Sequence, residues 1–130
     1  MYQRKLPEEY YCTADYALSI FGGKWKPRLL CILGHNESVR YGVLKKSMEN
    51  ISDAALADSL KELQESGIVI RHQYNEMPVR VEYSLSEKGK TLIPVLNVIS
   101  TWAVHHSDIG LYRGKHFEEV HRSSFKPLDK

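Results

Sequence analysis

Apolar residues recur every three or four positions, and then at every second position, between residues 51 and 89. The first part has the spacing of one face of an amphipathic helix, with apolar positions at Leu56, Leu60 and Leu63. Gly67 is expected to end this helix, because glycine readily adopts the left-handed backbone of a helix terminus. Two strand-like runs follow at 68–74 and 79–85, and the second alternates apolar and polar residues. The pattern therefore predicts a helix followed directly by a β-hairpin.

Shorter apolar segments precede this unit. A first helix is expected to end at Gly22-Gly23, and a second helix, apolar on more than one side, is expected to be buried. A short strand at 39–41 and a short helix over 42–49 come next. The inward positions of that short helix are predicted to be Val43, Leu44 and Met48. Together these elements predict a mainly α fold with a small β-hairpin wing (α+β), a winged helix-turn-helix, which usually binds double-stranded DNA.

The pattern returns to a helical period between residues 87 and 106. Pro94 is expected to kink this helix or to restart it. Its apolar surface exceeds what a terminal helix needs to dock on so small a domain. A partner subunit is the simplest cover, and the alternative is packing on the chain's own core. The predicted dimer interface comprises Tyr16, Ile20, Leu92, Val95, Leu96, Ile99, Trp102 and Ala103.

Length and composition fit one domain with a modest core, since the chain has 130 residues, of which 42% are hydrophobic. We divide it into an N-terminal arm (1–11), a winged helix-turn-helix domain with terminal dimerisation helices (12–106) and a C-terminal extension (107–130). The formal net charge of +2 permits nucleic-acid binding without favouring it. Because no apolar run approaches the roughly 20 residues that span a bilayer, and the N-terminus lacks the apolar core of a signal peptide, we expect a cytoplasmic protein with no membrane partner.

Several motifs occur in the order and spacing of a known family. The most specific is the segment Pro78–Gly89, with the sequence PVRVEYSLSEKG. The others are Cys12, Gly22-Gly23-Lys24-Trp25, Arg40-Tyr41, Ile51-Ser52, the three leucines, Gly67, Leu92, Pro94 and Trp102. Over residues 12–106 the chain resembles the HxlR-type winged helix-turn-helix regulators of bacteria. The resemblance implies a homodimer that binds a partly palindromic operator in double-stranded DNA, with the first and last helices building the dimer.

The resemblance also implies that some members sense electrophiles or oxidants through a cysteine near the N-terminus. Cys12 stands at the matching position, although Thr13 replaces the proline that usually follows. Two interpretations of Cys12 stay open: a sensing thiolate whose pKa the helix dipole lowers, or a small apolar residue packed at the dimer interface. Cys31, between Leu30 and Ile32, is expected to be buried. An oxidant effector fits the first interpretation, and a small-molecule ligand is the alternative effector for the regulator.

The helix that begins after Ser52 is the predicted recognition helix, with Ser52 as its N-cap. Its groove-facing positions are predicted to be Ser52, Asp53, Ala54, Ala55, Asp58 and Ser59. Family members often carry Lys, Arg, Gln or Thr at several of these positions. This helix instead carries Asp53, Asp58, Glu62 and Glu65 against a single Lys61. Because DNA phosphates repel negative charge, this acidic helix differs from a typical recognition helix in a way that affects DNA binding.

Two interpretations of the acidic helix follow. In the first, alanine side chains (Ala54, Ala55) contact thymine methyls, Asp53 or Asp58 accepts from cytosine amino groups, and the two serines contact phosphate or base. Phosphate contacts elsewhere then supply affinity and fix register. The candidates are Lys24, Lys26, Arg40, Tyr41, Lys45, Lys46, Lys61, Arg71, His72 and Arg80. In the second, the protein is an interaction module whose acidic helix binds protein and no longer contacts DNA.

Enzymatic chemistry finds little support in the sequence. We find no nucleophile–base arrangement, phosphate-binding loop or set of metal ligands, and the six histidines lack zinc-site spacing. We therefore predict a transcriptional regulator with no catalytic residues, no metal and no cofactor.

Overall fold

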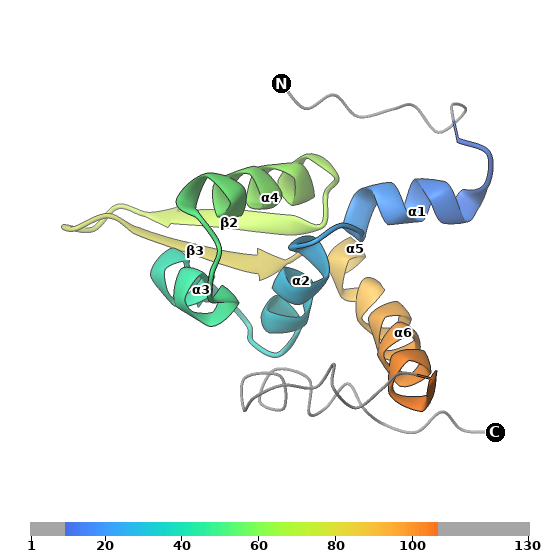
Figure 1. Ribbon diagram of the computed structural model, residues 1–130. Helices are drawn as coiled ribbons and strands as arrows, with labels where there is room; N and C mark the ends of the chain where they lie inside the picture. Colours follow the sequence, from blue (N-terminus) through green and yellow to red (C-terminus); the bar gives the residue numbers. More distant parts are fainter. Residues whose placement is uncertain (1–9, 107–130) are drawn as a thin grey trace.

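The computed structural model describes residues 10–106. The predicted arm, apart from its last two residues, and the predicted C-terminal extension lie outside the described residues. The elements in chain order are α1 (Thr13–Phe21), α2 (Lys26–Gly34), β1 (Val39–Arg40), α3 (Tyr41–Met48), α4 (Asp53–Glu65), β2 (Val69–Tyr74), β3 (Arg80–Leu85), α5 (Glu87–Lys90) and α6 (Leu92–His106). The predicted winged helix-turn-helix is confirmed: α3 and α4 are followed directly by the hairpin of β2 and β3 (Figure 1).

Local signals in the sequence set the ends of α4. The hydroxyl of Ser52 accepts a hydrogen bond from the backbone N–H of Ala55 at 3.0 Å, which satisfies one of the free donors at the helix start. Gly67 follows the helix with φ of +76°, a conformation that costs glycine little. The sequence therefore predicted both ends of this helix correctly.

The three strands form an antiparallel sheet in the order β1-β3-β2. β1 pairs with Glu82 and Tyr83 in the middle of β3, and Val69 of β2 pairs with Leu85 at its end, so the sheet is three strands wide at Glu82 and Tyr83. Tyr83 and Leu85 are buried, whereas Val79, predicted on the same buried face, is exposed. The tip of the hairpin extends beyond α3 and α4 (Figure 1), and its apolar residues Met77 and Val79 are exposed.

The core lies where α2, α3 and α4 meet the base of the sheet. Its largest fully buried side chains are Leu29, Leu30, Leu33, Leu44, Met48, Leu56, Leu60, Leu63 and Ile68. The burial of α2 is confirmed, and so are the inward positions Leu44 and Met48 of α3. The inward position predicted for Val43 is wrong, because this side chain is 54% exposed. Leu44 and Met48 are four residues apart and share one helix face, whereas Val43 lies about 100° away from Leu44.

The chain turns sharply between the sheet and α6. A Cβ atom at Gly89 in α5 would clash with the carbonyl oxygen of Ile68, so the close approach of these two segments requires glycine. α6 starts anew after Thr91, and Pro94 lies in its first turn, where a missing N–H costs nothing. α6 and α1 lie at the end of the domain opposite the hairpin tip (Figure 1). None of the helices in residues 10–106 has the length and apolar character needed to cross a membrane.

Candidate nucleic-acid interface

The two faces of α4 are defined by its leucines. The buried face comprises Leu56, Ser59, Leu60 and Leu63, and the exposed face comprises Ala54, Ala57, Asp58 and Lys61. Each exposed residue precedes a buried one by two positions, which is a rotation of about 200° around the helix axis. The groove-facing role predicted for Ser59 is therefore wrong, since its side chain is 8% exposed and packs inward. Ala57, which the sequence analysis missed, takes its place, and Ala55 is only half exposed.

Asp53, in the first turn of α4, is held by α3. Nζ of Lys45 lies 3.3 Å from Oδ1 of Asp53, and the hydroxyl of Tyr41 donates to the same oxygen at 3.2 Å. Desolvation first, and then the bond to Asp53, raise the pKa of Tyr41 above its ordinary value. These contacts join the two helices of the helix-turn-helix and compensate one carboxylate of the acidic helix.

Glu62, on the flank of α4, is paired with α2. Nζ of Lys26 lies 2.6 Å from Oε1 of Glu62, and the two side chains are only 11% and 22% exposed. The predicted contribution of Lys26 to phosphate binding is therefore wrong, because its ammonium group is turned inward. Asp53 and Glu62 are thus compensated within the chain, whereas Asp58 and Glu65 are exposed. The uncompensated negative charge on α4 is therefore smaller than its sequence indicates.

Arg80 holds the hairpin together. Its guanidinium group donates to Glu82 at 2.6 Å and to Glu76 at 2.8 Å, and it lies 3.9 Å from the ring centroid of Tyr74. The bond to Glu76, first among several, raises the pKa of Arg80. The hydroxyl of Ser38 donates to Glu82 and, with Arg80, lowers the pKa of that carboxyl group. The charge of Arg80 is therefore balanced inside the wing.

The other predicted phosphate-binding residues differ in whether another side chain of the protein lies close to their polar or charged group. Arg40 lies 3.8 Å from Glu82, and Lys24 lies over the ring of Trp25. His72 lies 3.3 Å from the hydroxyl of Ser84. Within residues 10–106, the exposed cations with no carboxylate partner on this side of the domain are Lys46, Lys61 and Arg71. They come from α3, α4 and β2, so they surround the exposed face of the helix-turn-helix.

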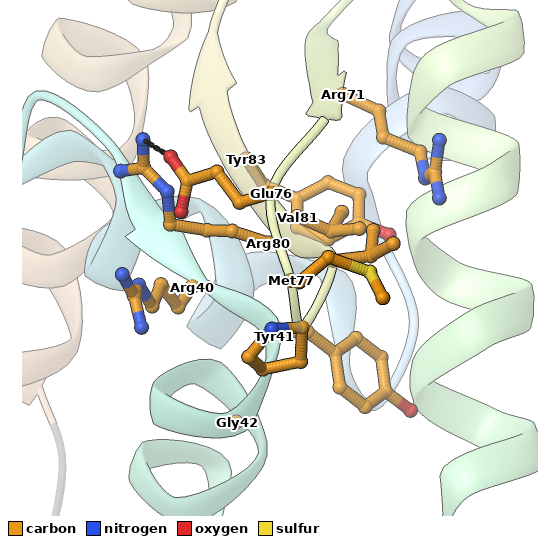
Figure 2. A pocket seen from close by; sticks show the side chains of 11 residues that line it. Arg40, Tyr41, Gly42, Arg71, Glu76, Met77, Arg80, Val81 and Tyr83 are labelled. Carbon is orange, nitrogen blue, oxygen red and sulfur yellow. Dashed lines mark hydrogen bonds and ion pairs between the residues drawn. The ribbon is translucent and has the colours of Figure 1, made fainter. Parts of the chain in front are cut away.

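A hollow of about 590 Å³ lies between the wing and the start of α3 (Figure 2). Tyr41 and Tyr83 line it with Met77 of the hairpin tip, and Arg71 contributes a cation from β2. Met77 is almost fully exposed. Because Tyr41 also contacts Asp53 of α4, the hollow adjoins the first turn of the recognition helix. An extended anion such as a phosphate backbone matches this combination of Arg71 and aromatic surface.

A second surface lies on α6. Val95, Val98, Ile99 and Trp102 are exposed there, and Trp102 is 63% exposed. Ile20 and Leu96, predicted at the dimer interface, are instead buried in the chain's own core, so their part of that prediction is wrong. Residues of the same chain are enough to cover both side chains. The remaining predicted interface residues, Tyr16, Leu92 and Ala103, are half-buried. Exposed Leu18 of α1, Val98 and Val104 of α6 are apolar residues that the predicted interface omitted.

The two cysteines have opposite environments. Cys12 is exposed and is the N-cap residue of α1. Cys31 is buried in α2, as predicted, and burial raises the pKa of its thiol to about 11. Because the thiolate is the reactive form, Cys31 is a poor nucleophile at neutral pH.

Residues 20–109 match the family described as HxlR-like helix-turn-helix. The putative regulatory protein MalR of Fusobacterium mortiferum is 44% identical over 94 residues, which cover 72% of this chain and 89% of MalR. The HTH-type transcriptional regulator YdzF of Bacillus subtilis is 42% identical over 90 residues, which cover 69% of this chain and 83% of YdzF.

The solved structures show the same architecture. The redox regulator HypR in its oxidised form aligns with a TM-score of 0.69 and 33% sequence identity. The alignment covers 75% of this chain and 99% of HypR. The fold and the order of its elements are therefore those of a known class of regulator.

Proposed function

The chain belongs to the HxlR-like helix-turn-helix family of DNA-binding transcriptional regulators, and we propose that it acts as a homodimer on a partly palindromic operator, with Cys12 as a thiol switch. The observation that carries the proposal is the exposed face of the helix-turn-helix with Lys46, Lys61 and Arg71, which have no carboxylate partner within residues 10–106. Cations at these places neutralise phosphates and so provide affinity without sequence preference. Two of the four carboxylates that suggested a protein-binding helix are compensated within the chain.

The exposed stripe of α6 supports the homodimer. Val95, Ile99 and Trp102 recur at helical spacing on the side that the chain's own core leaves uncovered. A two-fold axis through this stripe brings the same residues of two chains together. It also gives the dimer two recognition helices, which suit half-sites about one helical turn apart.

The position of Cys12 supports the thiol switch. Its thiol is exposed at the start of α1, where an oxidant can reach it. In the proposed reaction, two thiols each lose a proton and together give two electrons to an oxidant such as diamide, which becomes the hydrazine while an S–S bond forms between Cys12 of the two subunits. HypR, a relative of similar fold, is described as a redox regulator and has been solved in its oxidised form.

A gel-shift titration tests the proposal. The duplex is the DNA immediately upstream of the protein's own gene, followed by a genome-wide binding selection if that duplex gives no specific shift. We expect specific binding that weakens as the salt concentration rises. Diamide should change this binding in the wild type and in Cys31→Ser, and it should have no effect on binding by Cys12→Ser. Failure to bind any duplex specifically in both experiments would overturn the regulator proposal. An equal diamide response in Cys12→Ser would overturn the switch alone.

A further inference from the structure

We infer that Ala54, Ala57 and Asp58 contact the bases, and that each half-site of the operator therefore carries a cytosine with thymine beside it. The inference rests on the proposed DNA-binding function and specifies the sequence class that the same surface selects. It follows from the side chains of α4 that the fold leaves available.

The other polar residues at the start of α4 are occupied. The hydroxyl of Ser52 accepts the capping hydrogen bond from Ala55. The carboxylate of Asp53 is held by Lys45 and Tyr41. Ser59 is buried. Ser59 is therefore out of reach of a base, Oδ1 of Asp53 is engaged by α3, and Ser52 keeps only its O–H free to donate.

The available residues form one stripe. Ala54, Ala57, Asp58 and Lys61 are exposed and occupy positions i, i+3, i+4 and i+7 of α4. Within residues 10–106, Asp58 takes part in no ion pair or side-chain hydrogen bond. The residues in the first turns of a recognition helix contact base edges. Lys61, one turn further along, is placed for a phosphate.

Side-chain chemistry then selects the bases. An ionised aspartate only accepts hydrogen bonds, and the amino group of cytosine is the donor that a G·C pair presents in the major groove. Guanine presents O6 and N7 acceptors, which repel the same carboxylate. The methyl groups of Ala54 and Ala57 lack hydrogen-bonding atoms and suit the C5-methyl group of thymine. Compensation of Asp53 and Glu62 leaves Asp58 as the carboxylate on this stripe.

The test is a selection of bound sequences from a pool of random duplexes, with the wild type, Asp58→Asn and Asp53→Asn as a matched control. We expect the wild type to select cytosine at one position of each half-site. Asp58→Asn should select adenine there, because an amide pairs with N6 and N7 of adenine. Asp53→Asn should keep the cytosine. In competition between a duplex with cytosine and one with adenine at this position, the wild type should prefer cytosine and Asp58→Asn should prefer adenine, each by about fivefold to tenfold.

Three results would overturn the inference. The first is a wild-type site that contains no preferred cytosine. The second is selection of cytosine by Asp58→Asn as well as by the wild type. Thermal melting should show that Asp58→Asn is folded, since the substituted side chain is exposed. The third is salt-sensitive binding of the wild type with no enriched sequence. The first two leave the proposed regulator function in place, whereas the third leaves only DNA binding without sequence preference and overturns the proposed operator as well. Loss of all duplex binding by the folded wild type would overturn both.

Discussion

Lys45 of α3 and Asp53 of α4 form an ion pair at 3.3 Å across the turn of the helix-turn-helix. The contact carries two consequences. It fixes the first turn of α4 against α3, and it compensates one negative charge on the surface that we propose to face DNA. The negative charge that α4 presents at its surface is therefore smaller than the count of its acidic residues in the sequence suggests.

Replacing Asp53 with Ala should lower the free energy of unfolding by about 0.5–1.5 kcal/mol. The side chain is exposed, so the ion pair itself is weak, and the rest of the effect comes from losing a negative charge at a helix N-terminus. Urea unfolding monitored by circular dichroism measures the change. Asp58→Ala is the control on the same helix and should change stability by less, since Asp58 has no such contact. Equal effects of the two substitutions would show that Asp53 is not a link between the helices.

Replacing Lys26 with Ala should cost more, about 1–3 kcal/mol, because it leaves the carboxylate of Glu62 partly buried without its cation. The double variant Lys26→Met with Glu62→Gln keeps the packing of the lysine side chain and removes the unpaired carboxylate. It should therefore recover part of the stability that Lys26→Ala loses. The same unfolding experiment measures both variants. Lys24→Ala, an exposed neighbour, should be close to wild type. A loss for Lys26→Ala no larger than that for Lys24→Ala would contradict the buried pair.

The wing should loosen at acid pH. The hydrogen bond from Ser38, then Arg80, lowers the pKa of Glu82 below its ordinary value of 4.5. A carboxyl group whose folded pKa is depressed stabilises the fold above the unfolded pKa, and this stabilisation is lost as pH falls through the folded pKa. Stability should therefore fall below about pH 4.5 more steeply in the wild type than in Glu82→Gln. Parallel pH profiles from pH 7 to pH 3 would show that Glu82 makes no contribution.

Lys61 and Arg71 should each contribute one phosphate contact. Replacing either with Ala should weaken binding to all duplexes alike, roughly three- to tenfold at moderate salt, and should lower the slope of log affinity against log salt by about 1. Fluorescence anisotropy at several salt concentrations measures both quantities. Lys90→Ala removes an exposed lysine of α5 that pairs with Glu87, and it should leave the slope unchanged. If the slope of log affinity against log salt were unchanged in both Lys61→Ala and Arg71→Ala, the phosphate-binding surface would lie elsewhere on the protein.

The sequence predicted the elements better than the orientation of single side chains. The leucine spacing, the cap at Ser52 and the alternation in β3 are local signals, and each predicted element is present within a few residues. The groove-facing set is less accurate, because it includes Ser59, which is buried, and omits Ala57, which is exposed. Rotation from Leu56 would have placed Ser59 inside and Ala57 outside.

Long-range pairs escaped the sequence analysis for a different reason. Lys26 and Glu62 lie on helices far apart in the chain, and only the packing of α2 against α4 brings them to 2.6 Å. Ile20 and Leu96 continue apolar stripes on α1 and α6, and the spacing of a stripe does not tell which part faces the chain's own core. The fold settles this by burying both.

The measurement that tests the central claim most directly is sedimentation velocity of the protein alone and with the selected operator duplex. We predict a homodimer that binds one duplex as two chains, one on each half-site. Trp102→Glu places a charge in the exposed stripe of α6 and should give monomers, whereas Val43→Glu, an equally exposed apolar site on α3, should leave the dimer intact. A monomeric wild type that binds the duplex as a single chain, or a folded dimer that binds no duplex, would contradict the account.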